Sequence, residues 1–239
     1  MDRLWNETVG NPESPFEVLS YNIGGVEGRS LTNYFLGSNR NNPFFARCHK
    51  LLLALWAADG GRTSTEGMHS SPLLKGVPLM GGTFEIEEEN GQKISPEEVS
   101  KMLTDYIIQG QVMTLVMGLV DPSDDNWNGP LYVSTHIYAI DYMTGSQLIN
   151  ALTNWNGQLA FDLMSLPVHI PDPNPNSDSS TSETPSQTTQ ARSILESCLQ
   201  QSFGFKLAHG VILRIFKVTL GSLWREHDGS DIVPGTCAH

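Results

Sequence analysis

Two helix starts with complete capping signals constrain the fold of this chain more than any other sequence feature. Asn42 suits an N-cap and Pro43 suits the first helical position, where its missing N–H costs nothing. Apolar residues then recur every three or four positions as far as Trp56, and Gly60-Gly61 follows them. Ser95-Pro96-Glu97-Glu98 has the pattern of a capping box and precedes a second apolar stripe: Val99, Met102, Leu103, Tyr106 and Ile107. The sequence therefore predicts two amphipathic helices packed on a core.

Between and around these helices the pattern predicts a few short strands. Residues 18–21 and 31–36 are candidate strands in a segment otherwise rich in Gly, Asn, Pro and Ser. Residues 112–120 are apolar nearly all round, which indicates burial or a kink. After a polar turn, Leu131-Tyr132-Val133 is interpreted as a strand, and residues 142–155 are interpreted as a helix. The expected class is α/β and helix-rich.

Residues 169–190 interrupt the regular pattern. They contain Pro, Ser, Thr and Gln without apolar periodicity, a composition that is typical of a disordered insertion. Helical periodicity returns from Ala191 and again over 207–224. We therefore expect one domain in two parts, residues 1–168 and a helical part over 191–239, separated by the insertion.

Charge and cysteine content restrict the classes of partner and compartment. The 239 residues carry a formal net charge of -12, which disfavours binding to nucleic acid or to an anionic membrane surface. No run approaches the ~18 uninterrupted apolar residues of a membrane span. The start of the sequence lacks the pattern of a signal peptide. Cys48, Cys198 and Cys237 form neither a disulfide framework nor a zinc motif, so we expect free thiols and a cytoplasmic protein.

Several blocks of the sequence, taken in order, are similar to one known family. They are residues 39–45, 66–69, 109–114, 145–150, 202–210 and 221–225. Together they resemble the fungal branch of the capsular-polysaccharide-synthesis proteins, which are similar to GT-A glycosyltransferases. The resemblance covers nearly the whole chain outside residues 169–190.

This resemblance implies an enzyme that transfers a sugar from a nucleotide-sugar donor, with retention, to a glycan or small-molecule acceptor. In the family an Asp-x-Asp element holds Mn²⁺ or Mg²⁺, which stabilises the departing nucleotide diphosphate. This chain contains no such element, so a divalent metal is expected only for a longer form of the protein. Two alternatives stay open: a truncated or degenerate family member that acts by binding a partner, and a relative that glycosylates secondary metabolites.

The resemblance also implies candidate residues for donor or acceptor binding. Asn33 lies before the Asn42-Pro43 helix start, where related enzymes place a residue near the sugar ring, although a turn Asn often bonds only its own backbone. Glu66 and His69 lie in a Gly-containing loop that lines the donor or acceptor pocket in relatives, although loop Glu and His residues are usually solvated.

Three further candidates lie near the end of the chain. Ser222, Trp224 and His227 match the region where related retaining enzymes contact the β-phosphate, although Trp224 also continues an apolar stripe. Asp124-Asp125 is a weak metal candidate, because adjacent carboxylates on a turn usually point apart. We therefore expect no metal site in the chain. The sequence also lacks a P-loop, a dinucleotide fingerprint and a Gly-x-Ser-x-Gly nucleophile motif.

Overall fold

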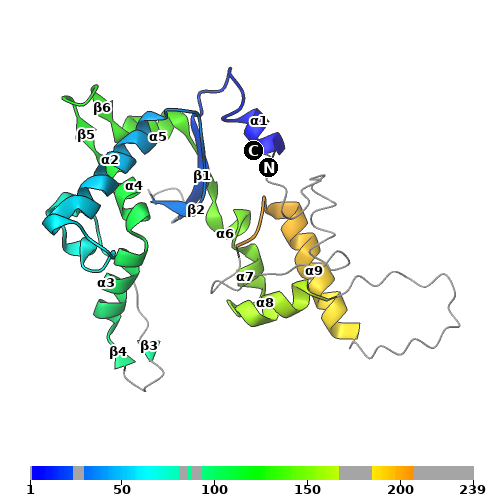
Figure 1. Cartoon of the computed structure of the whole chain (residues 1–239). Helices are drawn as coiled ribbons and strands as arrows, with labels where there is room; N and C mark the ends of the chain where they lie inside the picture. The colour runs from blue at the N-terminus through cyan, green and yellow to red at the C-terminus, as the bar shows by residue number, and fades with distance from the viewer. Residues whose placement is uncertain (1, 24–29, 81–85, 88–92, 167–184, 207–239) are drawn as a thin grey trace, which may run out of the picture. The chain divides into compact units, whose positions relative to one another are not determined.

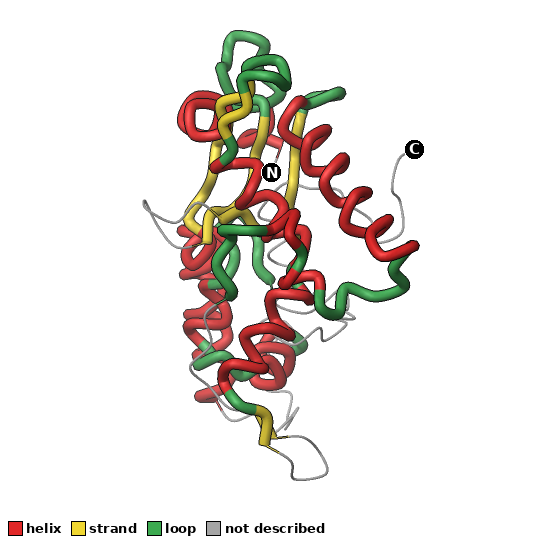
Figure 2. Tube along the Cα trace, turned by 90° about the vertical axis from the view of Figure 1, so that its left-hand side faces the viewer, coloured by secondary structure: helices red, strands yellow, loops and turns green. Residues whose placement is uncertain are grey.

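A computed structural model describes residues 2–23, 30–80, 86–87, 93–166 and 185–206 (Figure 1). The described part is a mixed α/β structure in which helices make up most of the regular segments (Figure 2). It divides into two compact units, Asp2–Asp141 and the residues from Tyr142 onward. The expected α/β, helix-rich class is confirmed.

A three-stranded sheet organises the first unit, in the order β2-β1-β7. β1 (Val18–Ile23) pairs antiparallel with β2 (Ser30–Ser38) and parallel with β7 (Ile137–Asp141). Both candidate strands of the Gly- and Asn-rich segment are thus confirmed. The β1–β2 register shifts between Ser20 and Asn22, so β2 is bulged opposite Tyr21. The parallel pairing places the carboxyl ends of β1 and β7 at the same edge, where Asn22 pairs with Asp141.

Three helices of this unit meet in its core. α2 (Pro43–Ala57) and α4 (Ile108–Gly118) contact each other, and α4 also contacts β2 and α5 (Gly129–His136). Asn42 caps α2 by accepting hydrogen bonds from the Phe44 and Phe45 N–H groups, as its sequence predicts. The largest fully buried side chains of this core are Phe44, Leu31, Leu55, Met68, Ile108, Met117, Val18 and Val112. Cys48 is buried among them.

Shorter elements complete the first unit. Its N-terminal helix is α1 (Asp2–Glu7), and three 3-10 turns follow α2: η1 (Ala58–Gly60), η2 (Met68–Ser70) and η3 (Pro72–Leu74). Two-residue pairs form β3 (Ile86–Glu87) with β4 (Lys93–Ile94), and β5 (Val120–Asp121) with β6 (Trp127–Asn128). α3 (Pro96–Tyr106) begins with the predicted capping box, in which Ser95 and Glu98 bond reciprocally.

The second unit is helical in its described residues. α6 (Tyr142–Gly145) and α7 (Leu148–Leu152) precede α8 (Gly157–Met164) and α9 (Pro185–Gln201). α7, α8 and α9 contact one another around a separate core that contains Ile149, Ala160, Leu163, Met164, Ala191, Ile194, Leu195 and Cys198. Cys198 is therefore a buried free thiol, like Cys48.

Two expectations about secondary structure were wrong. Residues 131–133 lie in helix α5 rather than in a strand, because Asn128 accepts a hydrogen bond from the Leu131 N–H and Pro130 occupies the first turn. The strand is the next segment, β7. The expected helix over 142–155 is two short helices, α6 and α7, followed by Asn154 and Trp155 with left-handed φ angles of 51° and 58°.

The boundary of the insertion also differs from the expectation. α9 begins at Pro185, six residues before the expected return of order at Ala191. Residues 169–184 and the expected helix over 207–224 lie outside the described residues. Among the helices that are described, none combines the length and the apolar character needed to cross a lipid bilayer.

Candidate functional site

A histidine–aspartate pair joins the loop after α2 to helix α3. The Asp105 carboxylate accepts hydrogen bonds from the backbone N–H groups of Gly67 and His69, each at 2.7 Å. The His69 Nδ1 atom lies 3.0 Å from both carboxylate oxygens. Asp105 is 7% exposed and lies at the inner side of α3. The carboxylate thus receives three donors from a single loop, and the loop places the imidazole.

The contact with Asp105 determines which imidazole nitrogen carries the proton. A carboxylate accepts hydrogen bonds, so Nδ1 is the donor and the neutral ring keeps its lone pair on Nε2. The His69 side chain is 20% exposed, against 11% for that of Asp105. The pair therefore combines a buried carboxylate with a partly accessible ring. This arrangement can accept a proton at Nε2.

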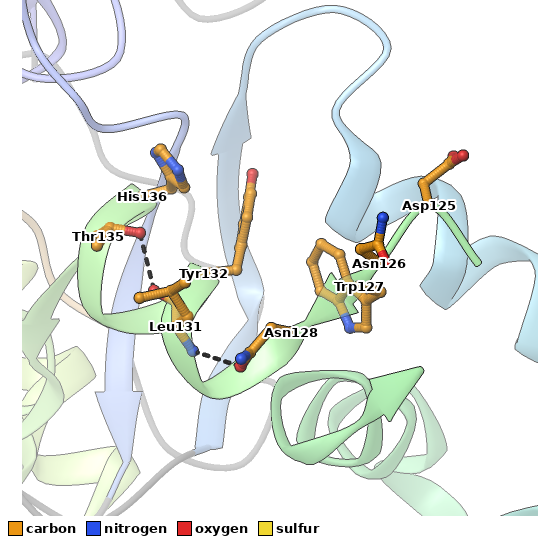
Figure 3. Close-up of a pocket in the computed structure, with 8 residues that line it drawn as sticks. All are labelled: Asp125, Asn126, Trp127, Asn128, Leu131, Tyr132, Thr135 and His136. Atoms are coloured by element: carbon orange, nitrogen blue, oxygen red, sulfur yellow. Dashed lines mark hydrogen bonds between the residues drawn. The ribbon is translucent and has the colours of Figure 1, made fainter. Parts of the chain in front are cut away.

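A second feature is an open pocket of about 430 Å³ between the β5–β6 hairpin and α5 (Figure 3). Its lining is Asp125, Asn126, Trp127, Asn128, Leu131, Tyr132, Thr135 and His136. Two hydrogen bonds shape the wall: Asn128 Oδ1 accepts from the Leu131 N–H at 3.0 Å, and Thr135 Oγ1 donates to the Leu131 carbonyl at 2.8 Å. His136 Nδ1 lies 2.8 Å from the Pro15 carbonyl, so Nδ1 carries the proton.

Tyr132 connects this pocket to the start of the sheet. Its hydroxyl donates to Glu17 Oε2 at 2.7 Å and accepts from Asn42 Nδ2 at 2.8 Å. Burial raises the pKa of Tyr132 well above its ordinary value, and the hydrogen bond to Glu17 adds to that rise. Asn42 consequently has two functions: its Oδ1 atom caps α2, and its Nδ2 atom binds Tyr132. One side-chain cluster therefore links the residue before β1, the N-cap of α2, and α5.

The hairpin wall of the pocket is fixed by Arg47. Its guanidinium lies 4.3 Å from the centre of the Trp127 ring, and its Nε atom lies 3.0 Å from Asp124 Oδ2. Trp127 Nε1 donates to the Val116 carbonyl at 3.1 Å. Asp125 and Asn126 have left-handed φ angles of 54° and 53° and form the two central positions of the turn that Trp127 N–H closes onto the Asp124 carbonyl. Asp124 and Asp125 therefore serve different purposes, one in an ion pair and one exposed at a turn.

The predicted site residues differ in their exposure and in their hydrogen bonds, and some of them lie outside the described residues. Asn33 is exposed in the bulged part of β2 rather than in a turn. Glu66 is exposed, and its backbone carbonyl accepts a hydrogen bond from Arg62. Of these two and His69, only His69 has a recorded side-chain hydrogen bond to another described residue. Ser222, Trp224 and His227 lie outside the described residues.

The sequence did not indicate Asp105, and of the pocket residues it singled out only Asp125, as a weak metal candidate. Asp105 lies 36 positions from His69, and no local spacing connects them. Its one sequence signal is an acidic residue beside the apolar stripe of α3, between Leu103 and Ile107. The pocket depends on Leu131 and Tyr132 belonging to a helix, whereas the sequence interpretation placed them in a strand.

The described residues contain no group of three or more His, Cys, Asp or Glu side chains that could hold a metal ion. Mn²⁺ and Mg²⁺ require several converging oxygen ligands. The divalent ion that the resemblance implies therefore finds no ligand set in this part of the chain.

Comparison with known proteins identifies relatives over the whole chain. No protein-family model matches it, and neither does any solved structure. Curated proteins do match. The relatives are fungal glycosyltransferases. The glycosyltransferase afumC of Aspergillus fumigatus is 29% identical over 242 residues, which cover 100% of this chain and 56% of that protein. The O-glycosyltransferase braB of Annulohypoxylon truncatum is 29% identical, with 99% of this chain and 53% of the relative covered.

A shorter match adds a third fungal protein. The probable glycosyltransferase FCK3 of Fusarium pseudograminearum is 32% identical over 74 residues, 31% of this chain and 17% of that protein. The chain thus spans little more than half the length of the two relatives that it matches from end to end. These similarities support a glycosyltransferase-like function. The narrower assignments, to the capsular-polysaccharide family and to the GT-A fold, stay predictions.

Proposed function

We propose that this chain forms part of an enzyme that transfers a sugar from a nucleotide-sugar donor to a hydroxyl group of an acceptor. The observation that carries the proposal is the end-to-end similarity to two fungal proteins named as a glycosyltransferase and an O-glycosyltransferase. An O-glycosyltransferase joins a sugar to an oxygen atom. The acceptor proposed here is accordingly a hydroxyl of a small molecule or glycan.

The sheet of the first unit is compatible with a donor site of the GT-A type. β1 and β7 are parallel, and their carboxyl ends meet at one edge, where Asn22 pairs with Asp141. Ligands of open α/β sheets bind beyond the carboxyl ends of parallel strands. We therefore expect the donor to bind near this edge, with the metal ligands supplied by residues other than those described.

The pocket beside α5 suits the acceptor better than it suits a phosphate. Asp125 places a negative charge at its margin, which repels an anion. Asn126, Asn128 and Thr135 offer both donors and acceptors of hydrogen bonds without carrying a charge, and His136 adds a ring nitrogen. Leu131, which is 59% exposed, adds an apolar surface. A neutral ring that carries hydroxyl groups matches this combination.

Isothermal titration calorimetry with UDP- and GDP-sugars in the presence of Mn²⁺ tests the donor part of the proposal. Mass spectrometry of the protein incubated with each donor and a panel of phenolic and sugar acceptors tests transfer. We expect saturable binding of one nucleotide-sugar class and a product heavier by one sugar. Absence of both binding and transfer across the panel would overturn the proposal.

The second candidate function is that of a non-catalytic relative that acts by binding a partner. The observation that favours it is that the described residues contain no metal-ligand set. Pull-down from an extract of the source cells, followed by mass spectrometry, would be its test. Donor binding without any transfer, together with a stoichiometric protein partner, would favour this candidate over the enzyme.

A further inference from the structure

A cavity of about 270 Å³ lies between α2, the C-terminal end of α4 and the turn of the β5–β6 hairpin (Figure 1). We call it the α2–α4 cavity. It shares no lining residue with the pocket of about 430 Å³ beside α5. The two are neighbours, because the Arg47 guanidinium that borders the smaller one packs on Trp127, which borders the larger one. The α2–α4 cavity is therefore a separate site with a chemistry of its own.

The charged side chains that border this cavity leave one cation available to a ligand. Arg47 already holds Asp124: its Nε atom lies 3.0 Å from Asp124 Oδ2, and its Nη2 atom donates to the Asp124 carbonyl at 2.9 Å. Lys50 Nζ lies 3.9 Å from Asp124 Oδ1, beyond hydrogen-bond distance, and the Lys50 side chain is 77% exposed. The lining thus has two cations against one carboxylate, in a protein whose formal net charge is -12. This local excess attracts an anion.

The remaining lining of the α2–α4 cavity is apolar and consists of Leu51, Leu115, Val116 and Leu119. Leu119 is 39% exposed, and Leu51 and Leu115 are only partly buried. A ligand that covers these side chains removes apolar surface from water, which stabilises the complex. An apolar cavity of about 150 Å³ holds one benzene ring, so the α2–α4 cavity has room for a single ring with a short chain.

We propose that the α2–α4 cavity binds a small apolar carboxylate, with its ring or chain against the leucines and its carboxylate beside Lys50. Inorganic phosphate lacks the apolar part, and a neutral or cationic ligand gains nothing from the Lys50 ammonium. Binding of this kind breaks no bond and needs neither a sugar donor nor an acceptor. The proposal therefore goes beyond the glycosyl transfer proposed above, and its test is independent of that reaction.

Phenylpropionate is the probe, because it combines a single ring, a short chain and a carboxylate. Phenylpropanol and phenylpropylamine keep the ring and carry a neutral and a cationic group in place of the carboxylate. Isothermal titration calorimetry with the full chain gives each affinity. We expect phenylpropionate to bind with a Kd on the order of 1 mM, as suits a ligand of this size. It should bind roughly twofold to fivefold more tightly than phenylpropanol, the gain that an exposed ion pair provides, and phenylpropylamine should bind most weakly.

Lys50→Glu reverses the charge at the rim and should reverse this order, so that phenylpropylamine binds more tightly than phenylpropionate. Lys75→Glu is the matched control, because Lys75 is also exposed and does not line the cavity, so the parent order should persist. Methyl NMR locates the ligand. The signals of Leu115 and Leu119 should shift with phenylpropionate. Those of Leu53, a 55% exposed leucine of α2 outside the lining, should not.

Several results would overturn the proposal. Equal affinities of the three probes for the parent protein would show that Lys50 does not select a carboxylate, and this comparison needs no variant. Absence of saturable binding up to about 10 mM would show that the cavity does not bind the probe. An unchanged order of affinities in Lys50→Glu, or methyl shifts confined to residues outside the cavity, would place any binding elsewhere. Failure of the protein to bind a nucleotide-sugar would overturn the proposed function and leave this site standing.

Discussion

Among single residues, Tyr132 connects several separate segments of the described chain. Its hydroxyl binds Glu17 before β1 and Asn42 at the start of α2, and its ring lies 4.9 Å from those of Trp127 and His136. We predict that Tyr132→Phe lowers the free energy of unfolding by about 1–3 kcal/mol, because a buried bond to a charged group is lost. Urea denaturation measures the change. Tyr106→Phe, at a tyrosine that is 77% exposed, should change it little, and equal effects of the two would contradict this account.

Tyr21 makes the free energy of unfolding depend on pH in the alkaline range. Burial raises the pKa of Tyr21 to about 12, and the neighbouring Tyr34 adds to the rise. An unfolded tyrosine ionises near pH ~10. The folded state therefore holds this proton more tightly, so the stability that it contributes is complete below pH ~10 and is lost as pH rises toward 12.

Burial also raises the pKa values of Cys48, Cys198 and Tyr132, so the stability of the parent protein alone does not isolate Tyr21. The measurement is therefore the difference in stability between the parent protein and Tyr21→Phe. The urea midpoint of the parent protein should fall relative to that of Tyr21→Phe as the pH rises from 8 to 11.5, because only the parent carries the ionisable group, so midpoints that are close at pH 8 should separate. Parallel curves would show that Tyr21 does not titrate in this range.

At the scale of elements, the junction between α4 and α5 depends on a close approach of backbone. A Cβ atom added at Gly129 would lie 2.4 Å from the Val116 carbonyl oxygen, whereas one added at Gly118 meets nothing within 4 Å. We predict that Gly129→Ala lowers the free energy of unfolding by about 1–3 kcal/mol through overpacking. Gly118→Ala should be neutral or stabilising by up to about 1 kcal/mol, since Ala favours a helix. Thermal denaturation of both variants provides the comparison.

The elements that could be predicted from the sequence are those whose signals are local. Asn42-Pro43 and the Ser95–Glu98 capping box mark helix starts within four residues, and both helices begin where expected. Residues 131–133 were misread because Tyr and Val favour strands, whereas the deciding hydrogen bond comes from Asn128 three residues earlier. The Asp105–His69 pair could not be predicted, because it joins residues 36 positions apart through the packing of a loop on α3.

At the scale of the molecule, the described residues form two cores that share no residue. Leu55 is 1% exposed in the first, and Ile149 is 1% exposed in the second. We predict that Leu55→Ala and Ile149→Ala each cost about 2–5 kcal/mol in the unit that contains them, through lost burial and a residual cavity. Hydrogen exchange read by mass spectrometry should show loss of protection in one unit for each variant. Equal loss of protection in both units from either substitution would show instead that they unfold together.

Each unit contains one buried cysteine whose reaction with a thiol reagent reports local unfolding of that unit. Cys48 lies in the first core and Cys198 in the second, and burial raises their pKa values to about 12 and about 11. At neutral pH both are thiols shielded from reagent, so each reacts only when its own surroundings open. With Cys237 replaced by serine, the rate at which a thiol reagent labels the peptide of Cys48 or of Cys198 measures how often that core opens locally. The chain thus contains one intrinsic probe of local unfolding in each of its two units.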